Sequence, residues 1–342
     1  MADVVTLGEA MVRLSPPSFQ RLEQAASLDV QVGGGELNVA VAVSRLGLSA
    51  AWISKLPDNA LGRLIRNKAR EQGVDTSQVV WSKEGRAGLY FMEFGASPRA
   101  SSVLYDRSFS AISQIRPGEI DWPKVFQNTK LFHVSGITPA LSPSAAAVTA
   151  EALKAAKAAG VRTSYDLNYR SKLWTDQEAQ ACQEPLMEYV DVLITTEEDT
   201  KVVFKITAAG EERDEKFTKV SAESFKVVAQ RLQEKFKFRI VAITLRENPS
   251  VWKNNWTAIA YCDGRFFDDK TYEVEIVDRV GAGDSFSGGF IYGCLTSGDV
   301  GTALKMGNAY SAVKHSIPGD LNWVTKAEME TVMKGGGLRV AR

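Results

Sequence analysis

The sequence has few of the residues from which covalent or metal frameworks are built. Its 342 residues include only 3 Cys and 2 His. Cys182, Cys262 and Cys294 lie far apart and form no C-x-x-C pair, so neither a disulfide framework nor a thiolate zinc site is predicted. We interpret the three thiols as small buried hydrophobic side chains of a protein in a reducing compartment.

An excess of charge of either sign is also lacking. Lys and Arg number 41 and Asp and Glu number 41, which gives a formal net charge of zero at pH 7 and a pI near 6.8. Such a chain offers no overall positive field to a long polyanion, which excludes generic binding to nucleic acids or to anionic membranes. Any charged ligand is therefore expected at a local site.

Neither a long apolar run nor a secretion signal is found. No stretch reaches the roughly 20 apolar residues that a membrane span needs, and the first residues contain no basic region followed by an apolar core. The composition, 44% hydrophobic and 24% charged, is typical of a globular protein with a large core. We expect a cytoplasmic protein without membrane association.

Strand-like and helix-like segments alternate along most of the chain. A helix is predicted over 36–46, with Gly47 to end it, and a second after the N-cap Ser142 and Pro143, with Gly160 to end it. Apolar strands are predicted over residues 4–8, 131–134, 163–167, 190–194 and 239–244. Continuous apolar strands are typical of a parallel sheet covered on both faces. The expected fold class is α/β, a single doubly wound α/β/α domain over residues 1–342.

Two stretches, about 11–32 and 87–113, interrupt this alternation. Within the second, Gly88–Phe94 and Ser102–Tyr105 alternate like half-exposed strands, with a Gly-Ala-Ser-Pro turn between them. We predict a small β-sheet outside the main one, with one face covering a site. Its other face is expected to contact a second copy of the chain, giving a dimer or an assembly of dimers.

The segment VDRVGAGDSFSGGFIYG, residues 277–293, carries the strongest functional signal. Its small residues after Asp284 are typical of a buried helix, and the amides at a helix N-terminus attract anions. Gly281, Ala282 and Gly283 are therefore predicted to form an anion hole for a phosphoryl group in transfer, with Asp284 as the base for an attacking hydroxyl. The alternative is that Asp284 only caps the helix and the glycines only shape a loop.

A second glycine-rich segment starts at Gly33 and precedes a helix of small residues. Glycine lets the backbone approach a ligand closely, and Asn38 faces the same side as Gly34 and Gly35 one turn earlier. These three residues are candidate ligand contacts; the alternative is a flexible turn before a tightly packed helix. The sequence has no GxxxxGK[ST] loop and no GxGxxG after a strand.

Together, these two segments resemble the two signatures of the ribokinase-like (PfkB) carbohydrate kinases. The D-x-x-G-A-G-D-x-F-x-x-G-F run begins at Asp278, and the likeness extends from Val5 to Asp320. The resemblance implies a doubly wound fold with a β lid, ATP as phosphoryl donor, Asp284 as general base, and Mg²⁺ held mainly by phosphates and water. A monovalent cation as activator stays open.

Within this family, several runs resemble the 2-keto-3-deoxygluconate kinases. They are Tyr90, Leu104–Arg107, Asp166–Arg170 and Ile317–Asp320. The resemblance implies phosphorylation of the terminal hydroxyl of that sugar acid, with Tyr90, Tyr105 and Asp320 near the sugar. The alternative for Asp320 is an ordinary Asx turn.

The carboxylate of such a substrate is expected to bind a positively charged side chain. An arginine fork binds a carboxylate through paired, charge-assisted hydrogen bonds, so Arg107 and Arg170 are the candidates for this contact. Without the resemblance, either one is simply a solvated surface charge. The alternative function is a neutral-sugar kinase of the same family, of the fructokinase or ribokinase type. A sugar-binding regulator without catalytic activity is disfavoured, because the Gly281–Asp284 run is intact.

For ATP, the resemblance points to residues at the ends of several strands and on a late helix, beside the anion hole. They are Asn168, Tyr169, Arg170, Thr196, Thr244, Arg246 and Asn308. Two segments depart from the family pattern. Thr196–Asp199 stands where many relatives have Asn-x-x-Glu, which leaves the Mg²⁺ contacts open, and Arg246–Ser250 replaces a Gly-containing turn after the late strand.

Overall fold

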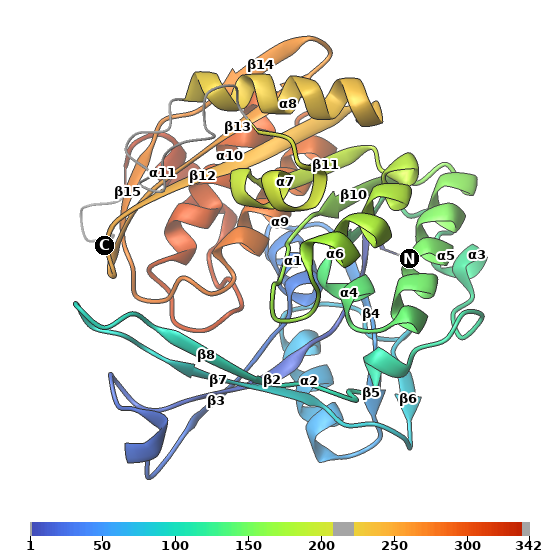
Figure 1. The fold of residues 1–342 in the computed structure, drawn as a ribbon, viewed down its shortest axis with the longest axis vertical. Helices are drawn as coiled ribbons and strands as arrows, with labels where there is room; N and C mark the ends of the chain where they lie inside the picture. Colours follow the sequence, from blue (N-terminus) through green and yellow to red (C-terminus); the bar gives the residue numbers. More distant parts are fainter. Residues whose placement is uncertain (1, 208–221, 337–342) are drawn as a thin grey trace.

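A nine-stranded sheet forms the centre of the part of the chain that the computed structural model describes, residues 2–207 and 222–336 (Figure 1). In spatial order its main path is β14 (Arg265–Asp268), β13 (Lys253–Cys262), β12 (Ile240–Ser250), β11 (Val192–Thr196), β10 (Arg162–Asp166), β9 (Leu131–Ser135), β1 (Val4–Leu7) and β4 (Ala50–Ile53). β15 (Tyr272–Glu275) pairs with β13. The strands from β4 to β12 are parallel, and β13 joins β12 in antiparallel register. The five predicted strands are confirmed.

Helices cover both faces of this sheet, which confirms the expected α/β/α class (Figure 1). One face carries α1 (Gly35–Arg45), α9 (Ala282–Thr296), α10 (Val300–Lys314) and α11 (Lys326–Met333). The other carries α3 (Trp122–Val125), α5 (Pro143–Ala158), α6 (Asp176–Gln183), α7 (Glu197–Phe204) and α8 (Ala222–Phe236). The shorter or peripheral helices are α2 (Ala60–Glu71), α4 (Ile137–Ala140), η1 (Leu22–Gln24), η2 (Ile112–Gln114) and η3 (Glu184–Tyr189). No helix in these residues has the length and apolarity needed to cross a membrane.

The two predicted helix boundaries follow from local capping. Ser142 Oγ accepts a hydrogen bond from the Ala145 amide, so it caps α5, whose first residue is a proline. Gly47 and Gly160 follow the ends of α1 and α5 with φ of 106° and 70°, a left-handed conformation that favours glycine. Both helices are confirmed to within a residue or two.

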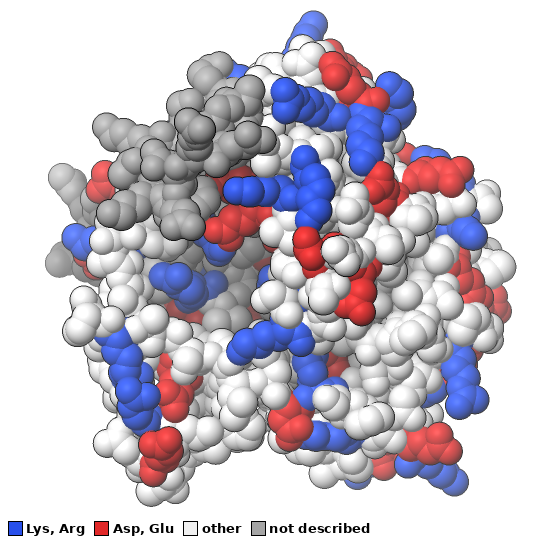
Figure 2. All heavy atoms as spheres, in the orientation of Figure 1, with Lys and Arg blue, Asp and Glu red and all other residues white. Residues whose placement is uncertain are grey.

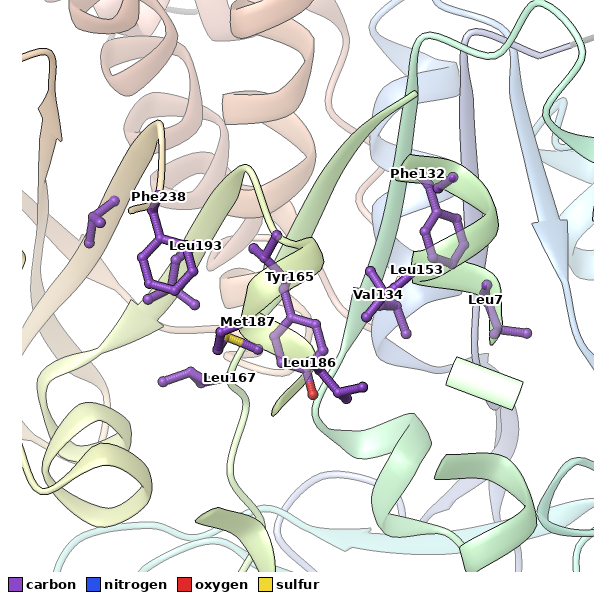
Figure 3. Packing of buried hydrophobic residues seen from close by; sticks show 14 of the residues in the cluster. Leu7, Phe132, Val134, Leu153, Tyr165, Leu167, Leu186, Met187, Leu193 and Phe238 are labelled. Atoms are coloured by element: carbon purple, nitrogen blue, oxygen red, sulfur yellow. The ribbon is translucent and has the colours of Figure 1, made fainter. Parts of the chain in front are cut away.

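The larger core lies between the sheet and the helices of the α5 face. Figure 3 shows Phe132, Tyr165 and Leu193, from the neighbouring strands β9, β10 and β11, with Leu153 of α5 and Phe238. All five side chains are at most 1% exposed. This packing fixes the carboxyl ends of the parallel strands, where ligands bind in open α/β sheets.

A separate four-stranded sheet is formed by the two interrupting stretches, as expected. Its order is β3 (Asp29–Gly33), β2 (Met11–Ser15), β7 (Gly88–Glu93) and β8 (Ser102–Asp106). Figure 1 shows it along the lower edge of the molecule, with the loop before α9 projecting toward it. A two-stranded sheet of β5 (Lys55–Pro57) and β6 (Val80–Ser82) lies beside it.

Strand register places alternate residues of the small sheet on opposite faces. The pairing aligns Gln31, Arg13, Tyr90 and Tyr105 in one row, and the adjacent row contains Val30, Leu14, Phe91 and Leu104. Tyr90 contacts the body of the molecule, whereas Leu104 is 58% exposed. The first row therefore faces the body and the second faces outward.

The late strand is longer than the predicted range of 239–244. The segment Arg246–Ser250, which departs from the family pattern, continues β12. Arg246 pairs with Trp256 and Glu247 with Asn255, so the long antiparallel partner β13 supplies the backbone hydrogen bonds that keep this segment extended.

Candidate active site

Asp284 lies in the first turn of α9, as the sequence predicts. Asn38 of α1 donates a hydrogen bond of 2.7 Å from Nδ2 to Asp284 Oδ2. Burial raises the pKa of the Asp284 carboxyl from 3.8 to about 6, although the Asn38 bond acts in the opposite direction. A carboxylate tuned in this way is a stronger proton acceptor than an exposed aspartate.

The turn before Asp284 requires glycine at its start. Gly281 is the N-cap of α9 with φ of 79°, and a Cβ at this position would lie 2.1 Å from the Asp320 carbonyl oxygen. Around Gly283, by contrast, a Cβ would have no neighbour within 4 Å. The helix N-terminus therefore opens onto free space at Gly283, which suits an anion.

A pocket of about 100 Å³ is located at this helix N-terminus. Its lining combines the start of α9 with the ends of β11 and β12: Thr196, Thr244, Arg246, Asn248, Asn254, Trp256, Arg279, Ala282, Gly283 and His315. Five of these are predicted nucleotide or anion contacts, and the structure brings them together. Figure 2 shows a hollow on this face with Lys and Arg side chains around it.

The sequence reasoning missed several residues of this pocket. Burial and the nearby Arg246 charge lower the pKa of Arg279, so two guanidinium groups influence each other at the pocket. Asn254 Oδ1 and Trp256 Nε1 are buried without a hydrogen-bond partner, which leaves unused polar atoms in the lining. Arg279 stands two residues before Gly281, so its positive charge within the motif is the sequence signal for it. Asn254 lies on β13 without any local signal.

The inner face of the small sheet contributes predicted sugar contacts. The Tyr90 hydroxyl donates a hydrogen bond to Asp320 Oδ2, and the Tyr90 and Tyr105 rings lie 5.9 Å apart. Gly33 packs so closely on Asp320 that a Cβ there would lie 2.1 Å from its Oδ2. Tyr90, Tyr105 and Asp320 are thus brought together.

Arg13 is a second residue that the sequence reasoning missed. It is 1% exposed and forms ion pairs with Asp278 at 2.8 Å and with Asp320 at 2.9 Å. Burial lowers the pKa of Arg13, but the charges of Asp320 and Asp278 outweigh this effect and keep it above the usual value. A single arginine between the two apolar residues Val12 and Leu14 gives no sequence signal for such a contact.

Arg107 is already paired with a carboxylate of the protein. Its Nε donates to Glu9 Oε2 at 2.8 Å, and its Nη2 contacts the same oxygen. This edge of the guanidinium is therefore not free to bind a substrate carboxylate as the prediction requires; only the remaining nitrogen, Nη1, has no such contact with Glu9. Glu9 itself was not predicted as a site residue.

Arg170 is exposed, and its Nη1 donates to the Tyr169 carbonyl at 2.9 Å. Its charge lowers the pKa of Asp284, which places it in electrostatic reach of the proposed base. Arg107 and Arg170 are the two arginines predicted to bind the substrate carboxylate. Arg107 is paired with Glu9, whereas the hydrogen bond given above for Arg170 is to a backbone carbonyl.

The glycine-rich start of α1 lies against the same centre. A Cβ at Gly35 would be 3.6 Å from Asp284 Oδ1 and 3.9 Å from Asn168 Nδ2. At Gly34, a Cβ would collide with the Glu9 carbonyl oxygen at 2.0 Å. Gly35, Asn168 and Asp284 are therefore neighbours, as predicted.

Five predicted nucleotide contacts are absent from the lining of this pocket: Asn168, Tyr169, Arg170, Gly281 and Asn308. For two of them, other contacts hold the side chain. The Tyr169 hydroxyl donates to the Trp174 carbonyl, and its ring packs against the core. Asn308 is 0% exposed, and its amide donates to Asp269 and to the Lys270 carbonyl. The late helix holds this side chain inside because the loop after β14 covers it.

Acidic side chains meet near the ends of β10 and β11. Burial raises the pKa of Asp199 to about 6 and also raises that of Asp166, with neighbouring carboxylates adding to the effect on Asp166. Thr196 caps α7 by accepting a hydrogen bond from the Asp199 amide at 3.1 Å. In the described ranges, no three His, Cys, Asp or Glu side chains gather as a metal site.

Comparison with known proteins reveals a family match. A model described as "pfkB family carbohydrate kinase" matches residues 1–324. The 2-dehydro-3-deoxygalactonokinase of Haloferax volcanii is 39% identical over 341 residues, with 100% of this chain and 99% of the relative covered. The 5-dehydro-2-deoxygluconokinase of Shouchella clausii is 31% identical over 320 residues, with 92% and 90% covered.

Solved structures agree with this match. The crystal structure of the 2-dehydro-3-deoxygluconokinase of Thermotoga maritima has a TM-score of 0.92 and 42% identity, with 98% of this chain and 100% of that chain covered. An E. coli structure described as a candidate ribokinase II with ATP and Mg²⁺ has a TM-score of 0.80 and 20% identity, with 98% and 100% covered. At the latter identity, the likeness concerns the fold.

Proposed function

The chain belongs to the pfkB family of carbohydrate kinases, and from this premise we propose that it phosphorylates the terminal hydroxyl of 2-keto-3-deoxygluconate with ATP. The products are 2-keto-3-deoxy-6-phosphogluconate and ADP. The substrate hydroxyl oxygen attacks the γ-phosphorus, the bond from this phosphorus to the β,γ-bridging oxygen breaks, and the hydroxyl proton passes to Asp284.

One observation carries the proposal: a buried carboxyl with a raised pKa lies in the first turn of a helix that opens onto a pocket. Asn38 orients the Asp284 carboxyl, and the start of α9 offers amides to the negative charge that develops on the phosphoryl oxygens. Base and anion hole are thus adjacent in one helical turn.

The sugar-acid part of the proposal is supported by the relatives named above and by cations at the site. Arg170 is the contact we assign to the substrate carboxylate, and Arg107 contributes Nη1 while Glu9 holds its other edge. Tyr90, Tyr105 and Asp320 would contact the sugar, together with the backbone of Gly34 and Gly35; the missing side chain at Gly34 makes room for the Glu9 carbonyl.

We assign ATP to the pocket at the start of α9. The donor set suits a polyphosphate, because Arg246, Arg279 and the helix N-terminus are all electropositive there. Thr196 and Thr244 offer hydroxyls to the nucleotide, and we also assign Asn168 as an ATP contact. Asn308 and Tyr169 would have to break their present hydrogen bonds before they could contact ATP. Mg²⁺, when bound, would neutralise phosphate charge, and Asp166 and Asp199 are the nearby carboxylates suited to its water shell.

The remaining proposals concern the protein as a whole. We propose one ribokinase-like domain over residues 1–342, with the four-stranded sheet as its lid. We further propose a cytoplasmic homodimer or assembly of dimers that binds neither nucleic acid nor membranes. The net charge of zero supports the absence of nucleic-acid and membrane binding, and the three free thiols support a reducing compartment such as the cytoplasm.

A substrate panel tests the function. Initial rates would be measured by coupled ADP detection with 2-keto-3-deoxygluconate, its galacto epimer, 5-dehydro-2-deoxygluconate, fructose and ribose, each with and without K⁺. The sugar acids should exceed the neutral sugars by about 100-fold or more in kcat/KM, because a neutral analogue leaves a charged contact unpaired. Equal rates with fructose or ribose would reject the sugar-acid assignment.

A further inference from the structure

Arg13 connects the small sheet to two separate loops of the main body. Its Nη2 lies 2.8 Å from Asp278 Oδ2 and its Nη1 2.9 Å from Asp320 Oδ1. The third donor, Nε, donates to Ser15 Oγ at 3.0 Å. Arg13 comes from β2, whereas both carboxylates are more than 260 residues away along the chain.

Each carboxylate in turn holds a segment of the active site. Asp278 accepts hydrogen bonds from the Val280 amide at 3.0 Å and from the Gly319 amide at 2.9 Å. Val280 immediately precedes the anion-hole turn at Gly281. Asp278 thus fixes the approach to the anion hole and, at the same time, the loop that carries Asp320.

Asp320 connects the same arginine to the sugar side. Its Oδ2 accepts from the Tyr90 hydroxyl, while its Oδ1 pairs with Arg13. Its carbonyl oxygen lies beside Gly281, where a Cβ would approach it to 2.1 Å. Asp320 therefore stands between the lid residue Tyr90 and the start of the phosphate-binding turn.

Burial makes this arrangement strongly dependent on Arg13. Asp278 and Asp320 are 1% and 4% exposed, and buried carboxylates need a charged or hydrogen-bonding partner. Lys314 lies nearby, but its Nζ donates to the carbonyls of Asp278 and Ile317, and burial lowers its pKa to about 8. Arg13 is the guanidinium that pairs directly with both carboxylates.

We propose that Arg13 is a positioning residue that couples the lid to the anion hole, so that the sugar hydroxyl and the phosphoryl group align only when both Arg13 ion pairs are formed. This inference rests on the proposed function. Binding at Tyr90 and Asp320 and binding at Gly281–Gly283 are then linked through one buried side chain. The role is distinct from catalysis, because the Nε, Nη1 and Nη2 atoms of Arg13 bind Ser15, Asp320 and Asp278 of the protein itself.

Three variants separate positioning from folding. Arg13→Gln removes both ion pairs and leaves two buried carboxylates with one cation fewer. Arg13→Gln combined with Asp278→Asn removes one charge of each sign, so the net charge of the buried network stays as in the wild type. Arg86→Gln breaks the exposed ion pair with Asp106 of β8, whose two contacts are 2.5 and 2.7 Å long, and serves as the matched control.

The decisive measurements are turnover of 2-keto-3-deoxygluconate, ADP affinity by calorimetry and Tm. In the double variant we expect a Tm within about 3 °C of the wild type, an ADP Kd within about threefold, and a kcat lower by about 100-fold, because a misplacement of about 1 Å costs this much. Arg86→Gln should match the wild type in all three. A stable double variant with a kcat within threefold of the wild type would overturn the proposal, as would loss of ADP binding in parallel with turnover.

Hydrogen exchange in the ligand-free protein keeps the inference separate from the substrate assignment. The amides of Val280 and Gly319 should exchange about tenfold faster in Arg13→Gln than in Arg86→Gln, since Asp278 loses its anchor. Unchanged exchange at both amides contradicts the coupling. If the wild type fails to phosphorylate any sugar acid, the proposed function fails, while this exchange arm still reports on Arg13.

Discussion

At the residue scale, the Asp284 carboxyl has to be buried and still accept a proton. Burial raises its pKa to about 6, and the hydrogen bond from Asn38 limits the rise. At neutral pH the group is therefore mostly ionised, yet its proton affinity is higher than that of an exposed aspartate. Such a group can accept a hydroxyl proton at the moment of attack and release it afterwards.

The Asp284→Asn variant should retain the fold and lose most of the turnover. Asn keeps an oxygen that can accept from Asn38, but it cannot take a proton, so kcat should fall by about 10²–10⁴-fold. Steady-state rates with ATP and the sugar acid measure this loss, and an unchanged Tm and ADP affinity serve as controls. Turnover close to the wild-type value would mean that Asp284 is only a helix cap.

The same assignment predicts the acid limb of the pH profile. Because the pKa in the folded protein is raised, Asp284 is protonated and inactive below about pH 6 and ionised above it. For the wild type, kcat/KM should therefore fall by about tenfold per pH unit below pH 6. The acid limb of the pH profile and the Asp284→Asn variant therefore test the same assignment of Asp284 as the base.

How far the sequence predicts a residue's role depends on where its partners lie. Asp284 and Gly281 belong to one continuous motif, so their neighbourhood can be predicted from local order. Arg13 and Glu9 cannot be found in this way, because their partners come from distant segments: Asp320 lies 307 positions from Arg13, and Arg107 lies 98 positions from Glu9. For Arg107, the chemistry was predicted but its internal partner was not.

At the element scale, the start of α9 brings two glycines with different tasks into one turn. Gly281 has a left-handed backbone and lies against the Asp320 carbonyl. Gly283 is helical and borders the pocket, with open space where a side chain would begin. The first glycine serves the fold of the turn, and the second serves the ligand.

A matched pair of variants separates these tasks. Gly281→Ala should lower the free energy of unfolding by at least 1–2 kcal/mol, roughly the cost of a left-handed backbone for a residue with a Cβ, in addition to the clash. Gly283→Ala should leave the Tm unchanged within about 3 °C, but it should raise KM for ATP or lower kcat by roughly tenfold, because its methyl group occupies pocket space. Thermal unfolding and steady-state kinetics of both variants test this. Wild-type kinetics in Gly283→Ala would exclude this helix N-terminus as the phosphate site.

Helices and strands were predictable from the sequence where residues with a capping role mark the ends of the element. Ser142, Pro143 and Gly160 define α5 locally, so its limits follow from capping chemistry. The late strand β12 was not predictable beyond residue 244, because its extension depends on antiparallel pairing with β13. Local composition, which includes Asn248 and Pro249, instead favours a turn.

At the scale of the whole molecule, the net charge of zero conceals a local concentration of positive charge. Arg246 and Arg279 line the pocket at the start of α9, and Figure 2 shows Lys and Arg side chains around the hollow on this face. Balancing acidic side chains appear over the same view. Neutrality therefore excludes a polyanion partner without excluding a small, highly charged ligand.

The two faces of the small sheet lead to a prediction about assembly. Arg13, Tyr90 and Tyr105 point toward the site, and the opposite row of Val30, Leu14, Phe91 and Leu104 is apolar, with Val30 54% and Leu104 58% exposed. Leu14 and Phe91 are half-buried, so the exposed apolar side chains are those of Val30 and Leu104. Exposed apolar side chains on one sheet face are a candidate contact between two copies of the chain. Leu104→Lys should therefore convert a wild-type dimer to a monomer in light scattering, since two charges would meet at a symmetric contact.

Val227→Lys is the matched control, because Val227 is an exposed apolar residue of α8, far from this sheet in the fold. It should leave the molar mass unchanged. A monomeric wild type, or a Leu104→Lys variant that stays dimeric, would show that this face is not the contact.

Because Tyr90 and Tyr105 lie on the same two strands as Phe91 and Leu104, a dimer formed here would also stiffen the strands that hold the sugar. The monomeric variant should therefore show a raised KM for the sugar acid with little change in KM for ATP.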